Sequence, residues 1–234
     1  MAPINREKRK YEKKLKRRLL AQDEFLIKRL QKEWQWIEDG IKREEAIRRM
    51  KSAGLTAIRA ILVITAIAGV VAVAAVAPNI FTVFGGRSFR RNYFKKNDVR
   101  QALYYLKKQN YLTIEEKNRE FKKISITERG RERIFSDTFD KLKINKQPKW
   151  DGIWRMVVFD IPDVHKWSRE GFRQKLKSMG LYQLQKSVFV TPYPSKEEVL
   201  YVAGIYGVLD YIRLVEAQKI LFDNDLKESF VIGE

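Results

Sequence analysis

The sequence predicts an α+β protein with three successive parts: N-terminal amphipathic and apolar helices, a winged helix-turn-helix, and a ferredoxin-like βαββαβ domain. Three observations predict this order. Lys and Arg concentrate in the first two thirds of the chain, one long uncharged stretch surrounds position 70, and the last third alternates between strand-like and helix-like apolar patterns. A length of 234 residues suffices for two compact units and an extension.

The positive charge of the chain is unevenly distributed. The formal net charge is +19, which implies an anionic partner, either nucleic acid or an acidic membrane surface. Residues 87–149 hold 19 basic and 8 acidic side chains, whereas residues 150–234 hold 11 and 12. We therefore expect a nucleic-acid surface in the middle segment. The chain has no cysteine, which excludes disulfides and fits the cytoplasmic location that we expect.

Residues 1–53 are predicted to form a basic amphipathic helical arm. Residues 6–18 hold nine basic and two acidic side chains. Apolar residues from Leu15 to Ile41 recur mostly at spacings of 3, 4 or 7, which predicts one apolar stripe on a long helix. The arm is expected to pack on the rest of the molecule or on a second subunit. Contact with phosphates, or with a membrane through Trp34 and Trp36, is the alternative.

Residues 54–135 are predicted to form the winged helix, beginning with an apolar helix. No charged residue occurs from position 60 to position 86, and the apolar run ends at Pro78. Two interpretations remain open. The run is either a buried first helix or a transmembrane segment at 60–78, which would tether a cytoplasmic DNA-binding domain to a membrane.

The middle of this segment is typical of a recognition helix followed by a wing. Asn97 and Asp98 can cap a helix whose apolar residues Val99, Ala102, Leu103 and Leu106 follow the i, i+3, i+4, i+7 spacing. Two strand-like runs, 112–114 and 121–127, then form a hairpin with a basic tip, and a charged helix starts at Arg131. A solvated helix beside an ordinary hairpin is the structural alternative. The predicted DNA contacts are Arg90, Arg91, Lys95, Lys96, Arg100, Gln101, Tyr104, Lys107, Lys108, Lys117 and Arg119.

A polar linker is expected at 136–149, a ferredoxin-like domain at 150–222 and a tail at 223–234. Within the domain, the sequence predicts strands at 153–160, 181–184, 187–191 and 211–215 and helices at 167–179 and 195–206. The resulting order, βαββαβ, is that of a ferredoxin-like sandwich with its helices on one face of an antiparallel sheet.

Two motifs in this domain carry a family resemblance. The run WDGIWRMVVFDIP at 150–162 and the run LYQLQKSVFVTPYP at 181–194 resemble the central domain of the PaaX family of transcriptional repressors. Residues 157–215 are also similar to the small Cas-two type CRISPR adaptation subunit. The resemblance implies a homodimer built on the ferredoxin-like domain, with two winged helices facing a palindromic operator in double-stranded DNA. The chain departs from the family in its basic arm and apolar segment.

Asp160 is the one candidate for catalysis. It ends the first strand of the domain, where the resemblance to Cas-two type nucleases implies an aspartate that holds a divalent cation across a dimer axis. Mg²⁺ at Asp160 is therefore the one metal considered, and no other cofactor is expected because the sequence lacks the common nucleotide and zinc motifs. The alternative function is a Mg²⁺-dependent endonuclease of the CRISPR-adaptation type, or a subunit derived from one. An Asp before Ile-Pro is also a frequent turn-capping residue.

Overall fold

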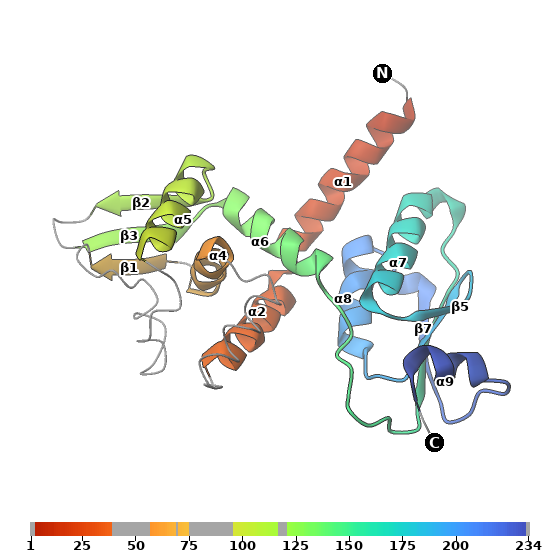
Figure 1. Ribbon diagram of the computed structural model, residues 1–234. Coiled ribbons are helices and arrows are strands. Elements are labelled where there is room, and N and C mark those ends of the chain that lie inside the picture. Colours follow the sequence, from red (N-terminus) through yellow and green to blue (C-terminus); the bar gives the residue numbers. More distant parts are fainter. Residues whose placement is uncertain (1–2, 39–56, 69, 75–95, 117–120, 233–234) are drawn as a thin grey trace. The chain divides into compact units, whose positions relative to one another are not determined.

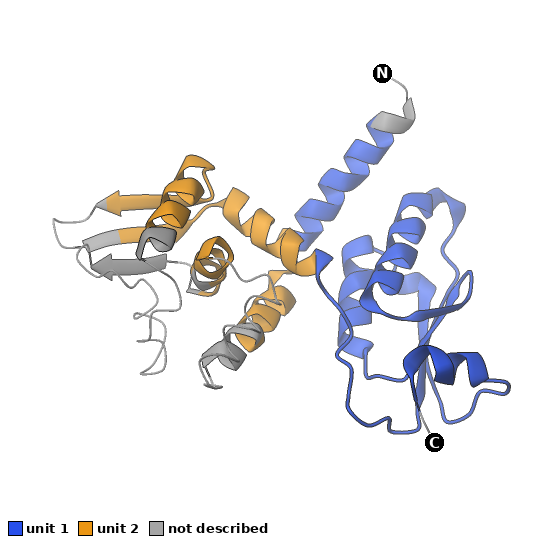
Figure 2. Ribbon diagram, in the orientation of Figure 1, with its two compact units in different colours: residues 1–19, 140–234 blue, residues 20–139 orange. Residues whose placement is uncertain are grey.

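The chain divides into two compact units. The computed structural model describes residues 3–38, 57–68, 70–74, 96–116 and 121–232. Figure 2 colours the two units, which we call unit 1 (Met1–Leu19 and Asp140–Glu234) and unit 2 (Leu20–Phe139). This division differs from the boundaries expected from composition, because the start of the basic arm belongs to the same unit as the C-terminal third of the chain.

Unit 1 contains a four-stranded antiparallel sheet with the strand order β5-β6-β4-β7. Along the central strand β4, Val157 and Phe159 are buried on one face and Trp154 is buried on the other, because successive side chains of a strand point in opposite directions. The strands are β4 (Trp154–Phe159), β5 (Tyr182–Gln185), β6 (Val188–Thr191) and β7 (Ile212–Ala217).

Two helices, α7 (Lys166–Met179) and α8 (Lys196–Tyr206), pack together on the face of the sheet that bears Phe159 (Figure 1). Phe172 of α7 is fully buried and meets the Phe159 ring edge-on at a centroid distance of 5.4 Å. Gly180 ends α7 with a φ of 98°, a left-handed conformation that favours glycine. The βαββαβ order and the packing of α7 and α8 on the same face confirm the predicted ferredoxin-like fold.

The opposite face of this sheet is partly covered by a short helix, α9 (Asn224–Phe230). Leu226 is fully buried in a second apolar cluster with Trp154 and Val190, and the Trp154 indole donates to Asp223 Oδ2 at 3.3 Å. The expectation of a tail at 223–234 is therefore wrong for this helix. Its seven residues are too few to display a clear helical period in the sequence.

The predicted linker at 136–149 is also wrong over its first part. Helix α6 (Glu128–Asp140) continues through it, and Phe139 is buried. Beyond the helix, Leu142 and Ile144 are buried within unit 1, and the Ile144 amide donates to the Met179 carbonyl at 3.0 Å. These apolar residues lie among Lys and other polar side chains, which conceals them in the sequence.

The basic arm is two helices rather than one. Helix α1 (Pro3–Ala21) lies almost entirely in unit 1, and α2 (Asp23–Glu38) lies in unit 2. Leu26 and Leu30 of α2 are fully buried and α2 packs against the next helix of unit 2, so that part of the predicted apolar stripe is confirmed as a packing surface. The predicted membrane contacts of Trp34 and Trp36 fall on side chains outside those described.

Unit 2 combines four helices with a three-stranded antiparallel sheet of order β1-β3-β2 among its described residues. Its further elements are α4 (Ala57–Ala68), β1 (Val70–Ala74), α5 (Lys96–Lys108), β2 (Leu112–Glu116) and β3 (Phe121–Ile126), followed by α6. This order is compatible with the predicted winged helix. The expected apolar first helix is α4, and residues 75–95 between β1 and α5 lie outside the described residues, so the helix-turn-helix remains a prediction.

The transmembrane interpretation of 60–78 is not supported, because the apolar run divides into α4 and β1. Ile61 and Val63 of α4 are buried within unit 2, and β1 pairs with β3. Arg59, which directly precedes the uncharged run, is itself buried and forms an ion pair with Asp137 of α6. Over the described ranges, we find no helix with the length and apolar character that crossing a bilayer requires.

Candidate nucleic-acid interface

Helix α5 is amphipathic in the way that the sequence predicts. Ala102 and Leu106 on its inner face are buried, at 4% and 0% exposure, and the helix packs against α4 and β2. Leu103 is half-buried beside them. Burial of this stripe fixes the rotation of α5 about its own axis. The predicted inner face is therefore confirmed for these three residues.

The opposite face of α5 is exposed and carries five of the predicted contacts. Tyr104 is 70% exposed, although a large aromatic side chain is usually at least half-buried. Within the described residues, no ion pair or side-chain hydrogen bond engages Arg100, Lys107 or Lys108. These side chains are therefore accessible to a ligand. The exposed residues of this face are Arg100, Gln101, Tyr104, Lys107 and Lys108.

A β-hairpin follows α5 and is fixed to the start of α6. Strands β2 and β3 pair from Leu112 opposite Ile126 to Glu116 opposite Lys122. The Thr127 hydroxyl accepts the Gly130 amide at 3.0 Å, which makes Thr127 the N-cap of α6. A Cβ at Gly130 would collide with the Tyr111 carbonyl oxygen, so glycine permits the close approach of helix and hairpin.

Six of the predicted contacts cannot be located in the structure. Arg90, Arg91 and Lys95 precede α5, and Lys117 and Arg119 belong to the hairpin tip; all five lie outside the described residues. Lys96 begins α5, but its side chain also lies outside the described set. The structure therefore brings together only the contacts that α5 itself provides.

Asp160 follows β4 directly and is exposed. Its backbone amide donates to the Tyr211 carbonyl oxygen at 3.0 Å, which fixes the turn between the strand and α7. Among the described residues of the chain, Asp160 belongs to no cluster of three or more His, Cys, Asp or Glu side chains with metal-binding geometry. The roles of Asp160 in catalysis and metal binding therefore remain predictions.

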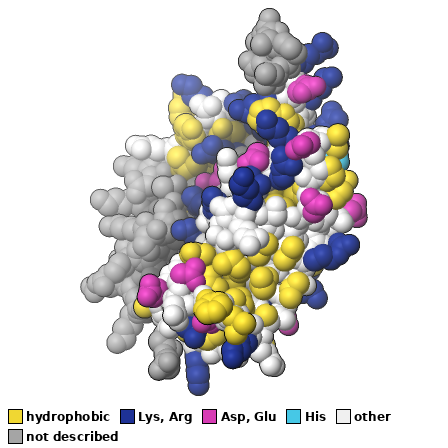
Figure 3. Space-filling model, turned by 90° about the vertical axis from the view of Figure 1, so that its right-hand side faces the viewer, with side chains coloured by type: hydrophobic (Ala, Val, Ile, Leu, Met, Phe, Trp, Pro, Cys, Tyr) yellow, Lys and Arg dark blue, Asp and Glu magenta, His cyan; other side chains and the backbone are white. Residues whose placement is uncertain are grey.

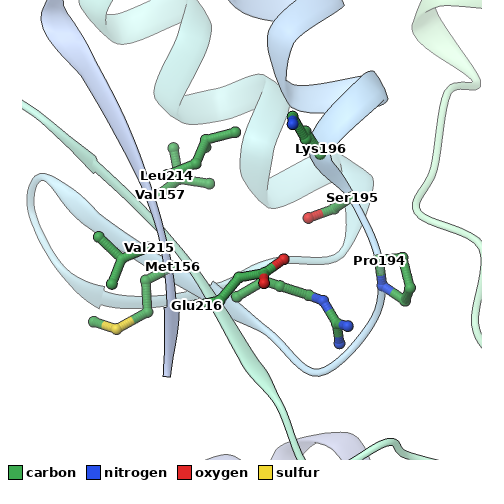
Figure 4. Close-up of a pocket in the computed structure, with 9 residues that line it drawn as sticks. Met156, Val157, Pro194, Ser195, Lys196, Leu214, Val215 and Glu216 are labelled. Atoms are coloured by element: carbon green, nitrogen blue, oxygen red, sulfur yellow. The ribbon is translucent and has the colours of Figure 1, made fainter. Parts of the chain in front are cut away.

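Unit 1 also contains a pocket that the sequence analysis did not identify (Figure 4). Its volume is about 470 Å³, and it is lined by residues 155–157 of β4, 214–216 of β7 and 194–196 at the start of α8. Its three segments are far apart in the sequence, so periodicity could not reveal the pocket.

Arg155, one of the charged residues that line this pocket, is bonded to neighbouring parts of the fold. Arg155 Nη1 donates to Asp151 Oδ1 at 2.9 Å and to the Pro192 carbonyl oxygen at 2.8 Å. The hydrogen bond from Arg155 lowers the pKa of the Asp151 carboxyl group below its ordinary value. Arg155 thereby joins the start of β4 to the turn before α8 and stabilises the ferredoxin-like domain.

Unit 1 is thus a ferredoxin-like domain. Helices cover one face of its antiparallel sheet, and α9 partly covers the other. Comparison with protein families agrees with this fold, since residues 147–228 match the family described as the PaaX protein central Cas2-like domain. This part of the chain is therefore similar to the PaaX central domain, and the resemblance inferred from its two motifs is confirmed. None of the curated proteins compared with the chain matches it.

Proposed function

We propose that the protein is a DNA-binding transcriptional regulator that reads the major groove with the outer face of α5. The observation that carries this proposal is the exposed set formed by Arg100, Gln101 and Tyr104 on the side of α5 opposite the buried Leu106. Arg can donate to both acceptors of a guanine edge, and Gln offers the donor and the acceptor that match an adenine edge. The major groove is wide enough to admit an α-helix. Tyr and Lys side chains suit the neighbouring phosphates.

The surrounding elements support this role for α5. The hairpin β2–β3 follows the helix directly, as the wing of a winged helix does, and its tip carries Lys117 and Arg119 in the sequence. Helix α5 packs on α4, and the buried Arg59 of α4 forms an ion pair with Asp137 of α6. A recognition helix on such a packed support requires little ordering when it binds, which favours affinity.

The PaaX-type domain supports a dimeric regulator. Members of the family that the motifs resemble are transcriptional repressors, and the two edge strands β5 and β7 leave backbone groups of unit 1 available for pairing with a second copy. A two-fold dimer would present two α5 helices to two half-sites of a palindromic operator. Such a regulator works in the cytoplasm, where its DNA is.

The proposal is tested by selection of bound duplexes from a random pool with the full-length protein at moderate salt. We expect enrichment of one palindromic sequence, with an affinity that also falls as salt rises. A pool that stays random after several rounds would contradict sequence-specific regulation. Adding Mg²⁺ to the recovered duplexes, with the Asp160→Asn variant beside the wild type, tests the nuclease alternative, which requires cleavage by the wild type alone.

A further inference from the structure

We propose that the outer face of α1 is a second DNA contact, which binds the phosphate backbone of a duplex without regard to sequence. The proposal rests on the proposed function only for the identity of the polyanion as double-stranded DNA. It concerns unit 1, whose residues from 150 onwards carry no excess of positive charge. Helix α1 changes that balance, since residues 6–18 hold nine basic and two acidic side chains.

Helix α1 is fixed on unit 1 along one side. Arg18 Nη1 donates to the Ile205 carbonyl oxygen at the end of α8, at 3.3 Å. A Cβ at Gly207 would overlap the Arg18 guanidinium group, so the glycine leaves room for this arginine. The Tyr11 ring lies against α7, where a Cβ at Gly171 would stand 3.2 Å from the Tyr11 hydroxyl. Burial raises the pKa of Tyr11 to about 12, so this contact stays uncharged at neutral pH.

The side of α1 opposite this contact is a stripe of four cations. Arg6, Lys10, Lys13 and Arg17 follow one another at intervals of four, three and four residues, which places them on one helical face, and all four are exposed. The stripe runs for about 17 Å at the rise of an α-helix. Glu7 and Glu12, the two acidic residues of this helix, fall on other faces.

Repulsion within this stripe points to an anionic ligand. Like charges at i, i+4 destabilise an isolated helix, and none of the four cations forms an ion pair among the described residues. A ligand with closely spaced negative charges would remove that cost. Duplex DNA carries one negative charge per about 1.7 Å of its axis, so one duplex can contact the whole stripe.

The apolar side chains of α1 favour DNA over a membrane. A helix that lies on a membrane surface needs an exposed apolar face opposite its charged one. In the part of α1 from Arg6 to Leu19, which belongs to unit 1, the apolar residues Tyr11, Leu15 and Leu19 lie on the docked side and are half-buried or buried. In Figure 3, several Lys and Arg side chains lie near the top of the view, where α1 lies, and the largest group of apolar side chains lies lower down.

The test measures how affinity for a scrambled duplex depends on salt, with the full-length protein. The stripe variant combines Lys10→Gln, Lys13→Gln and Arg17→Gln, and the matched control combines Lys177→Gln, Lys186→Gln and Lys219→Gln, all exposed residues of the same unit. Each lost phosphate contact lowers the slope of log affinity against log salt by about 0.9. We expect the stripe variant to lose about 2 to 3 units of slope and the control to lose less than about one.

Two outcomes would overturn the proposal. One is equal slopes for the stripe variant and the control. The other is loss of binding to phosphatidylserine vesicles by the stripe variant with its DNA slope unchanged, which would assign the stripe to lipid. Failure of the regulator proposal is a different result: no duplex would be preferred over a scrambled one, while the α1-dependent slope would remain.

Discussion

Two amphipathic helices of this protein, α5 and α7, use their cations in opposite ways. Helix α7 carries five Lys or Arg residues and one Glu, and α5 carries four and one Asp. In α7 the arginines bond within unit 1. Arg169 donates to the Ile161 carbonyl oxygen at 3.0 Å and pairs with Asp163 at 2.8 Å, and Arg173 donates to the Lys186 carbonyl oxygen at 3.0 Å.

In α5 the cations have no such partners within the part of the chain that is described. Arg100, Lys107 and Lys108 are exposed beside a tyrosine that is 70% exposed. A count of charges would favour α7 as the DNA-contacting helix, whereas the bonds that the charges make favour α5. The comparison teaches that the engagement of cations within their own fold, rather than their number, distinguishes an interface from a structural helix.

The largest expected difference between the two helices concerns their aromatic residues. Phe172→Ala in α7 removes a fully buried ring from the core of unit 1 and should lower the free energy of unfolding by about 3–5 kcal/mol. Tyr104→Ala in α5 should change it by no more than about 0.5 kcal/mol. Urea titration followed by circular dichroism measures both. Similar losses of stability in the two variants would show that Tyr104 is structural and would contradict the difference between the two helices.

The arginines of the two helices are expected to affect different quantities: Arg169 affects stability, and Arg100 affects the affinity for DNA. Arg169→Ala should lower the free energy of unfolding by about 1 kcal/mol, because it removes a hydrogen bond and an ion pair that are partly shielded from water. The affinity of the Arg169→Ala variant for DNA should equal that of the wild type. Arg100→Ala should leave stability unchanged and weaken DNA binding. Unfolding and fluorescence-anisotropy titrations on the same preparations measure both quantities, and a stability loss in Arg100→Ala would contradict its assignment.

The smallest effect is a pH dependence that arises in α7. Lys175 is buried and donates to the Asp140 carbonyl oxygen at 3.1 Å; burial lowers its pKa to about 8, although the Asp140 charge opposes this. An unfolded lysine has a pKa of about 10.4, so above pH 8 the unfolded chain binds more protons and stability should rise with pH. The rise should end near pH 10, because the buried Tyr11 and Tyr206 have raised pKa values and unfolded tyrosines ionise first.

Thermal unfolding at intervals from about pH 8 to about pH 9.5 measures this rise. In Lys175→Met the rise should disappear, and in Lys177→Met, where the exposed neighbour is replaced, it should persist. A rise that survives in Lys175→Met would assign the titration to another group.

Most of unit 1 and the inner face of α5 could be predicted from the sequence. Strands such as β4 and helices such as α7 have the apolar periods that their burial requires, so local pattern and tertiary packing agree there. The apolar run after Arg59 could not be assigned from its pattern. A continuous apolar run suits a buried helix and a buried strand equally, and here it forms α4 followed by β1.

The features that sequence reasoning missed depend on contacts between distant residues. Tyr11 and Arg18 pack on α7 and α8, more than a hundred residues further along the chain, and the spacing within α1 gives only the stripe and not what it contacts. The same holds for the pocket near Arg155 and for Leu226 of α9. In the sequence, these contacts are indicated only by single apolar or aromatic residues within charged segments.

The central claim is that the outer face of α5 reads base edges, and the ratio of affinities for the selected duplex and a scrambled duplex tests it most directly. The variants are Arg100→Ala with Gln101→Ala, and Arg169→Ala as the control from α7. Each bidentate base contact contributes about 1–3 kcal/mol of discrimination, so we expect the ratio to fall at least about tenfold in the α5 variant and to stay unchanged in the control. An unchanged ratio in the α5 variant would contradict the claim.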